Sequence, residues 1–227
     1  MAQQERAIRT RQAILMAASA VFDEVGYEAA TISEILKRSG VTKGALYFHF
    51  TSKDELAQAV LTAQVGSVPP IPHRELTLQE GLDSALVMAY LLSRGDSLVR
   101  GSVRLTVEQG VRDGLDRQVP IQAWLDVNEA VLAKAKADGE LLPHIDVAAA
   151  ARLFASCFTG VQIMSKIMTG HTDMLQRVAE LQQYLMTSVA VPGVLVQLDF
   201  RPERGQEVYE EAMKAQEEAE ASRAEQV

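Results

Sequence analysis

The amino-acid sequence predicts an all-α protein, and three observations support this fold class. First, 48% of the 227 residues are hydrophobic but only 5% are aromatic. Second, apolar residues recur three and four positions apart, whereas the alternating apolar and polar runs that are typical of strands are few. Third, helix-start residues such as Thr31 and helix-stop residues such as Gly40 separate the apolar segments.

The first predicted helix covers residues 6 to about 25 and ends at Gly26-Tyr27. One of its sides is apolar and consists of residues at helical spacing, namely Ile14, Ala18, Val21, Phe22 and Val25. This side is expected to face the core.

Two short helices joined by a glycine turn follow. Thr31 and Glu34 fit a capping box, and Gly40 stands where a helix must stop. The second helix begins at about Thr42, and Leu46 and Phe50 repeat at i and i+4, so both can face the core. Two short helices joined by a tight turn have the arrangement of a helix-turn-helix motif, whose second helix reads DNA. The spacing alone also fits an ordinary helical hairpin.

In the helix-turn-helix interpretation, the second short helix enters the major groove. Lys43 can reach guanine acceptors, and Gly44 lets the backbone approach closely. Tyr47 and His49 can donate to phosphate oxygens, and Lys53 adds a phosphate anchor at a positive helix end. The alternatives to these DNA contacts are that Tyr47 packs in the core and that Lys53 is simply exposed to solvent.

Other residues of this region receive different roles. Arg6 and Arg9 precede or begin the first helix and are either solvated or part of an arm that touches phosphate or the minor groove. Phe48 and Phe50 are predicted to pack in the core. The predicted DNA-binding residues are Arg6, Arg9, Thr31, Thr42, Lys43, Gly44, Tyr47, His49 and Lys53.

Residues from about Arg9 to Leu56 resemble the DNA-binding region of the TetR family of one-component transcriptional regulators. The matching positions are Ile14-Leu15-Met16-Ala17-Ala18, Phe22, Gly26-Tyr27, Gly40-Val41-Thr42-Lys43-Gly44-Ala45-Leu46-Tyr47-Phe48-His49-Phe50 and Lys53. The resemblance implies the DNA-contacting roles given above. It also implies a three-helix DNA-binding domain joined by a fourth helix to a larger helical bundle that binds an effector and dimerises.

The fourth helix is predicted from Lys53 to about Val65, with Ser52 and Glu55 as a second capping box. A proline-rich linker, with Pro69, Pro70 and Pro72, ends it. We therefore expect three parts: a helix-turn-helix domain (1–52), a connecting helix and linker (53–72), and an effector-binding and dimerisation domain (73–227).

The helices of the third part follow from similar signals. Thr77 and Glu80 form a third capping box, Pro120 suits a first helical residue and Asp146 can cap a helix. The predicted helices begin at about Thr77, Pro120, Asp146 and Met174, and residues 97–110 are ambiguous. The final acidic segment, Glu203 to Val227, is predicted to be helical at first and frayed at its end.

Charge and composition limit the possible functions. The net charge is −8, but residues 1–55 hold seven basic and seven acidic residues, so the excess lies outside the predicted DNA-binding domain. The sequence has a single cysteine, Cys157, and lacks both a hydrophobic N-terminal segment and an apolar run near 18 residues. These features indicate a cytoplasmic protein without membrane contact. We expect it to be associated with the nucleoid when it is bound to DNA.

Catalytic and metal-binding patterns are missing from the sequence. The four histidines lie far apart, and neither a phosphate loop nor a nucleophile elbow is present. We therefore expect neither enzyme activity nor a cofactor or metal. A helical enzyme that handles lipids or isoprenoids is the alternative from another class.

Two further motifs resemble the γ-butyrolactone autoregulator receptors of actinomycetes. They are Gln122-Ala123-Trp124-Leu125 and Phe158-Thr159-Gly160-Val161-Gln162. The resemblance implies that Trp124, Thr159 and Gln64 hydrogen-bond a lactone, while other residues line an acyl-chain slot: Leu86, Tyr90, Val127, Phe158, Gln162 and Ile163. The alternatives to these effector contacts are that Trp124 is a core residue and that Gln64 is an exposed helix residue.

A mechanism follows from this assignment. A homodimer, formed through the helices at Asp146 and Met174, would hold two readers one DNA turn apart on a palindromic duplex operator. Lys53 and Gln64 lie roughly 16 Å apart on the fourth helix, so a butyrolactone-like effector at Gln64 would shift the reader and release the DNA. A TetR-type regulator that senses an antibiotic or another drug is the alternative.

Overall fold

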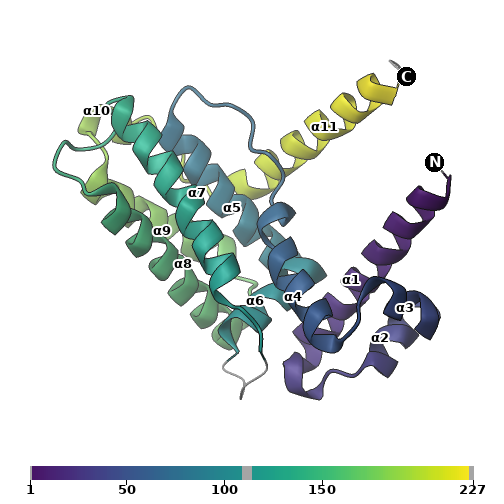
Figure 1. Cartoon of the computed structure of the whole chain (residues 1–227). Coiled ribbons are helices and arrows are strands. Elements are labelled where there is room, and N and C mark those ends of the chain that lie inside the picture. The colour runs from purple at the N-terminus through teal and green to yellow at the C-terminus, as the bar shows by residue number, and fades with distance from the viewer. Residues whose placement is uncertain (1, 109–113, 225–227) are drawn as a thin grey trace. The chain divides into compact units, whose positions relative to one another are not determined.

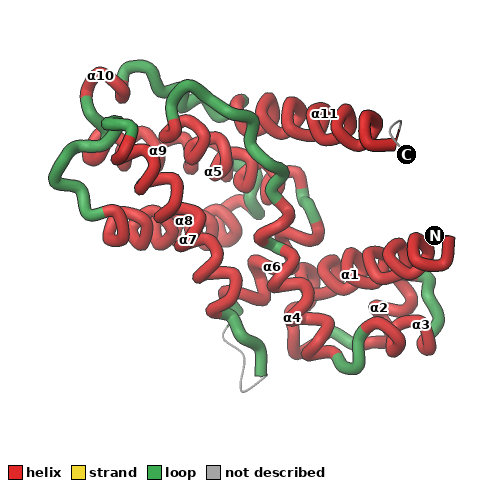
Figure 2. Tube along the Cα trace, turned by 45° about the horizontal axis from the view of Figure 1, so that its top comes forward, coloured by secondary structure: helices red, strands yellow, loops and turns green. Residues whose placement is uncertain are grey.

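The computed structural model describes residues 2–108 and 114–224, which form helices and connecting loops (Figure 2). The only β pairing among these residues is an isolated bridge between Leu141 and Ala190. The helices are α1 (Ala2–Ala29), α2 (Ile32–Ser39), α3 (Lys43–His49), α4 (Lys53–Ala63), the 3-10 turn η1 (Val65–Ser67), α5 (Thr77–Arg94), α6 (Ser97–Val107), α7 (Gln118–Ala137), α8 (Val147–Thr169), α9 (Met174–Val189), α10 (Pro192–Leu195) and α11 (Arg204–Ala224). The predicted all-α fold is confirmed. The last three residues of the predicted C-terminal helix, 225–227, lie outside the described residues.

The helices form two compact units, each built from two segments of the chain. The first unit comprises Met1–Ser67 and Gly95–Ala123, and the second comprises Val68–Arg94 and Trp124–Val227. Figure 1 shows by colour how the chain leaves the first unit after α4 and returns to it for α6. The ambiguous segment 97–110 therefore contains a helix that completes the N-terminal unit.

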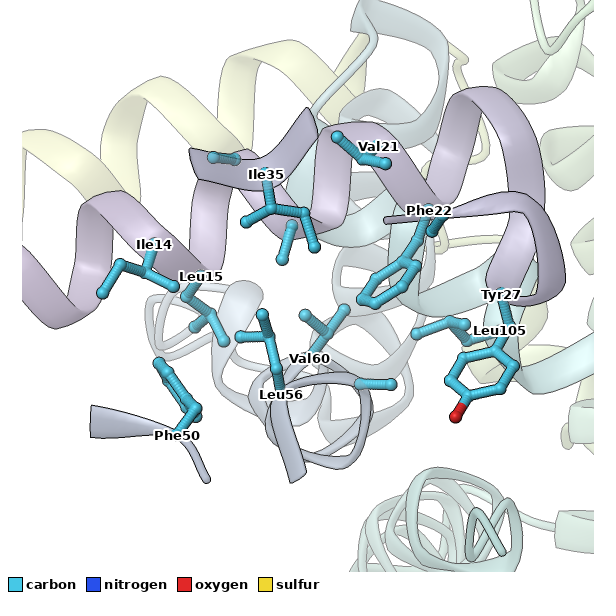
Figure 3. Packing of buried hydrophobic residues seen from close by; sticks show 14 of the residues in the cluster. Ile14, Leu15, Val21, Phe22, Tyr27, Ile35, Phe50, Leu56, Val60 and Leu105 are labelled. Carbon is cyan, nitrogen blue, oxygen red and sulfur yellow. The ribbon is translucent and has the colours of Figure 1, made fainter. Parts of the chain in front are cut away.

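A single apolar core holds the first unit together. Buried side chains of α1, α2, α3, α4 and α6 meet in it, as Figure 3 shows: Ile14, Leu15, Val21, Phe22, Ile35, Phe50, Leu56, Val60 and Leu105. Helices α1 and α6 approach so closely that a Cβ on Gly101 would lie 2.2 Å from the carbonyl oxygen of Ser19. Glycine at position 101 is therefore a packing requirement.

Helix α1 is interrupted where the sequence predicts its end. Gly26 has φ 78° and ψ 178°, which breaks the helical backbone. The amide of the next residue, Tyr27, donates to Glu108 Oε2 at 2.9 Å, and a Cβ on Gly26 would lie 2.3 Å from Glu108 Oε1. A residue with a side chain would have a strained φ here and would displace the Glu108 carboxylate from its present position.

The helices α2, α3 and α4 begin where the sequence predicts, and α2 also ends at the predicted glycine. Thr31, Thr42 and Ser52 each accept a hydrogen bond from the backbone N–H three residues on, at 3.0–3.2 Å. Gly40 ends α2 with φ 67°. Glu55 accepts from both the N–H and the hydroxyl of Thr51, and these bonds lower the pKa of its carboxyl.

In the second unit, α5 packs against α9 and α11, and α8 packs against α9. The third predicted capping box is wrong, because Thr77 is the first residue of α5 and its amide donates to Glu140 Oε1 at 2.7 Å. Leu78 N donates to the other oxygen of this buried carboxylate at 2.7 Å. Glu80 instead accepts from Arg74 N at 2.9 Å.

A buried ionic cluster fixes α11 and the linker onto α5. The carboxylate of Asp83, which is fully buried, accepts from Arg74 Nε at 2.9 Å, from Arg204 Nη2 at 2.8 Å and from Gln79 Nε2 at 2.8 Å. Arg74 also donates to Glu211, which raises the pKa of the guanidinium. This cluster joins residues that are up to 137 positions apart in the chain.

Among the described helices, α8 alone is long and apolar enough, by length and composition, to cross a membrane, and 17% of its most apolar window is buried. The sequence shows no continuous apolar run here because Arg152, Thr159 and Lys166 interrupt it. A helix that lies in a contact between two protein chains has the same composition.

Candidate nucleic-acid interface

One side of α3 is anchored in the core and the other is bare. Leu46 and Phe50 are fully buried beside α1 and α4. Thr42, Lys43, Gly44, Tyr47 and Phe48 are exposed. A Cβ on Gly44 would meet no atom within 4 Å, so this face of α3 is open for close approach.

Of the predicted reader residues on α3, Lys43, Gly44 and Tyr47 lie on this bare side, whereas His49 is half-buried. Tyr47 is 43% exposed, which excludes the alternative that it is a core residue. Lys43 Nζ lies 5.9 Å from the centroid of the Tyr47 ring, a cation–π contact one helical turn apart. A flexible cation and a phenol therefore stand side by side on the exposed surface.

The prediction that Phe48 packs in the core is wrong, whereas the same prediction for Phe50 is confirmed. Phe48 is 80% exposed, since α3 directs Leu46 and Phe50 inward and residue 48 to the opposite side. The half-buried His49 ring lies 5.1 Å from the Phe48 ring, edge to face, and 6.5 Å from the Phe50 ring. His49 thus contacts the aromatic side chains on both sides of it.

Lys53 is held by the end of α1. Its ammonium donates to the carbonyl oxygens of Tyr27 at 2.9 Å and Ala30 at 3.2 Å and lies 4.2 Å from the Tyr27 ring centroid. The Tyr27 hydroxyl in turn donates to Asp54. Lys53 therefore connects the start of α4 to the break in α1, a role that the sequence did not indicate.

Arg6 and Arg9 lie on a helix, because α1 begins at Ala2. Both are exposed, and Arg9 Nη2 lies 3.8 Å from the Glu5 carboxylate. On α2, Arg38 donates two bonds to Glu24, at 2.7 and 2.8 Å, and this pairing lowers the pKa of the Glu24 carboxyl. The first helix therefore begins four residues earlier than predicted, and both arginines project from its exposed N-terminal part.

Gln64, the predicted effector contact of the first unit, is buried. It is 5% exposed at the C-terminal end of α4, and its Oε1 accepts from the Ser102 hydroxyl of α6 at 2.9 Å. The alternative that Gln64 is a plain exposed residue is therefore excluded. Sequence reasoning missed Ser102, because the segment around it gave no clear helical signal.

Two further polar contacts join α6 to α1. Glu108 accepts from Tyr27 N, as described above, and Arg104 Nη1 donates to the Asp23 carbonyl oxygen at 2.5 Å. Both partners lie in the last turns of α1, directly before the helix-turn-helix. Helix α6 is thus hydrogen-bonded to both α1 and α4.

The remaining predicted effector residues belong to the second unit and lie on three helices. On α5, Leu86 is fully buried and the half-buried Tyr90 ring lies 5.4 Å from the Tyr209 ring. On α7, Trp124 is half-buried and Val127 is exposed.

The other four predicted effector residues lie on α8. Gln162 is buried, Phe158 is half-buried and Ile163 is exposed. The exposed Thr159 donates its hydroxyl to the Ala155 carbonyl oxygen at 2.9 Å.

One groove of the second unit, about 450 Å³ in volume, lies elsewhere. Its lining combines α9 with the segment before α11: Gln176, Ala179, Glu180, Gln183, Leu198, Asp199, Phe200, Arg201 and Pro202. None of the predicted effector residues is part of it.

Helices α8 and α9 carry an exposed apolar surface, which we call the seam surface. Its side chains are between 50% and 76% exposed: Leu153, Met164, Ile167 and Met168 of α8, and Tyr184 of α9. Met164, Ile167 and Met168 follow one another at helical spacing. An apolar surface of this kind is typical of a protein contact site.

The chain is similar to known regulators over most of its length. Residues 14–60 match the family described as bacterial regulatory proteins, tetR family. The A-factor receptor protein of Streptomyces griseus is 39% identical over 198 residues, which are 87% of this chain and 70% of that protein. The crystal structure of TylP, a TetR regulator from Streptomyces fradiae, has 61% identity and a TM-score of 0.87, and the match covers 92% of this chain and 99% of that chain.

A crystal structure of a gamma-butyrolactone receptor, an ArpA-like protein, has 27% identity and a TM-score of 0.65, with 91% of this chain and 98% of that chain covered. The resemblance seen in the sequence is thereby confirmed, and the enzyme alternative is not supported. The chain belongs to the TetR family of transcriptional regulators, which are DNA-binding proteins and not enzymes, and it is close to the γ-butyrolactone receptors within that family.

Proposed function

We propose that this protein is a dimeric transcriptional repressor that binds a palindromic operator and leaves it when a small γ-butyrolactone-type molecule binds. The observation that carries the proposal is the bare, polar and aromatic face of α3, mounted on a scaffold in which α6 is bonded to both α1 and α4. Similarity to the A-factor receptor and to a gamma-butyrolactone receptor supports the class of effector.

The proposed DNA contacts divide into base and phosphate contacts. Lys43 is assigned to base edges, where an ammonium can donate to guanine acceptors, and Gly44 allows close approach. Tyr47, His49 and the hydroxyls of Thr31 and Thr42 are assigned to phosphates. The remaining residues, Arg6, Arg9 and Lys53, add positive charge at the helix ends, and Lys53 also holds α1 in place.

Dimerisation is assigned to the seam surface. Two copies of α8 and α9 packed about a twofold axis would form a four-helix contact, in which each apolar side chain meets the same patch of its partner. TetR regulators bind operators as dimers, and the two readers must then lie about 34 Å apart to reach successive major grooves.

Release is assigned to α6. Gln64 Oε1 and the Tyr27 amide are both occupied by α6 side chains, so a displacement of α6 strains α4 and α1 together. An effector that prefers the displaced position shifts the population toward a dimer that no longer fits the operator. The assignment of the effector to Trp124, Thr159, Gln64 and the six slot residues remains a prediction.

The proposal is tested by a gel shift with DNA from upstream of the protein's own gene, with and without γ-butyrolactone-type extracts. We expect a shifted band that the extract removes. The double variant Lys43→Ala/Tyr47→Ala should lose at least about a hundredfold in affinity, since each lost polar contact costs about 1–3 kcal/mol and the dimer contains each site twice. The control Lys37→Ala removes an exposed charge of α2 and should bind nearly normally.

Three results would speak against the proposal in different ways. Unchanged binding by the double variant would exclude α3 as the reader. A band that only antibiotics remove would identify a drug-sensing regulator instead. Because Trp124 is the only tryptophan, its fluorescence should change when the effector binds, and an unchanged signal during DNA release would exclude Trp124 from the effector site.

A further inference from the structure

The exposure of Phe48 is unusual for its residue type. At 80% it is the most exposed phenylalanine that the structure describes, and it projects from the same short helix whose Leu46 and Phe50 are fully buried. A phenyl ring left in water forgoes the free energy of apolar burial. A ring in this position therefore gains stability when another apolar group covers it.

The Phe48 ring has an aromatic neighbour on one side. The His49 ring packs against its side at 5.1 Å with an interplanar angle of 83°, and His49 itself contacts Phe50, which the core fixes. This contact limits the motion of the Phe48 ring on that side, which gives His49 a positioning role in addition to the proposed phosphate contact.

Phe48 shares its face of α3 with Gly44. The two residues are four positions apart, so they lie one turn from each other on the same side of the helix. Because nothing stands over Gly44, the helix axis can come close to a partner surface at this point. Such an approach brings the Phe48 ring against the same surface.

We propose that Phe48 reads the 5-methyl group of a thymine in each half of the operator. This inference rests on the proposed function, in which α3 lies in the major groove. A phenyl ring has no donor or acceptor, so it cannot read the hydrogen-bonding pattern of a base edge. The thymine methyl is the apolar group that the major groove presents, and Phe is one of the side chains that contact it.

The dimer presents Phe48 twice, which makes the specificity symmetric. The twofold axis requires two thymines at equal distances from the operator centre, one in each half-site. Lys43 and Tyr47, on the neighbouring strip of α3, would contact adjacent groups. Phe48 thus contributes a preference at one base pair per half-site that no polar contact supplies.

The test uses a palindromic duplex that the wild-type dimer selects from a random library. Each symmetric pair of thymines is replaced by deoxyuridine, which removes only the methyl groups. At one pair we expect the wild-type affinity to fall about fourfold per methyl, or about fifteenfold for both half-sites, as burial of a CH₂-sized group predicts. Phe48→Ala should bind the original duplex more weakly and respond less than about twofold to the same replacement.

Two matched variants separate the possible outcomes. Phe48→Leu keeps an apolar side chain and should retain part of the methyl preference, whereas Lys43→Ala should weaken binding but keep the full preference. Methyl sensitivity that persists in Phe48→Ala, or a wild-type protein that is insensitive at every pair, would overturn the inference while DNA binding stands. Failure of the wild-type protein to select any duplex would instead contradict the proposed function. Far-ultraviolet circular dichroism should be unchanged for Phe48→Ala, because the side chain lies outside the core.

Discussion

The two units of this protein are held together in different ways. In the first unit, an apolar core carries short helices whose ends are capped by the nearest hydroxyl in the chain, such as Thr31 for α2 and Thr42 for α3. In the second unit, buried carboxylates bind elements that are far apart in the chain, as Glu140 does for α5. Local caps define the short helices of the first unit, which the apolar core and a few contacts from α6 and Glu108 then hold together, whereas buried long-range ionic contacts join the helices of the second unit.

The exposed surfaces of the two units differ as well. The reader face of α3 combines a lysine, a tyrosine and a phenylalanine around a bare glycine. The seam surface of α8 and α9 is apolar over several helical turns. The reader face suits DNA, which offers charged phosphates and a few apolar groups, whereas the seam surface suits another protein chain.

The largest expected effect comes from the buried ionic cluster of the second unit. Asp83→Asn removes the charge that compensates Arg74 and Arg204, so we expect a loss of about 3 kcal/mol in the free energy of unfolding, as for other broken buried ion pairs. Urea denaturation at fixed protein concentration, followed by circular dichroism, measures this loss.

A matched control for this variant lies at the outer end of the same cluster. Glu211→Gln removes the second partner of Arg74, but the Glu211 side chain is half exposed, so the loss should stay below about 1 kcal/mol. Equal losses for Asp83→Asn and Glu211→Gln would show that burial of Asp83 does not determine the stability of the second unit.

The difference between local and long-range contacts also explains which contacts could be predicted from the sequence. The caps at Thr31 and Ser52 were predicted from the sequence because donor and acceptor are three residues apart. The capping of Thr77 by Glu140 spans 63 positions, and neither residue alone indicates the other.

The residues of the candidate site were predicted with unequal success. Residue types indicated α3 as the candidate reader helix, but type alone could not separate the exposed Phe48 from the buried Phe50. The helical phase, set by Leu46 and Phe50 one turn apart, was the signal that could have separated them. Gln64 was predicted as an effector contact, but the sequence does not indicate its hydrogen-bond partner Ser102, which lies 38 residues away in a segment without a clear pattern.

The seam surface provides the second prediction. Ile167→Glu places two carboxylates in the proposed contact between subunits, since the twofold axis duplicates the change. We expect the dimer dissociation constant to rise at least about a hundredfold, because an unpaired buried charge costs several kcal/mol. Sedimentation velocity over a range of protein concentrations measures the shift toward monomer.

The control for the seam variant is Ile8→Glu, which changes a similarly exposed isoleucine of α1 in the other unit. This variant should leave the monomer–dimer equilibrium unchanged. An Ile167→Glu protein that sediments like the wild-type dimer would show that the subunits associate through a different surface.

The smallest expected effects come from two glycines of the first unit, and they separate scaffold from reader. Gly101→Ala forces α6 away from the Ser19 carbonyl and should cost about 1–3 kcal/mol of stability.

Gly44→Ala meets no neighbouring atom and should stabilise α3 by about 0.5 kcal/mol or more. Its methyl group would nevertheless stand on the face that approaches the groove, so DNA affinity should fall at least about tenfold. Thermal unfolding and a gel shift on the same protein samples measure both quantities. If Gly44→Ala bound DNA as tightly as the wild type, close backbone approach at α3 would be excluded, and with it the placement of Phe48 against the base edges.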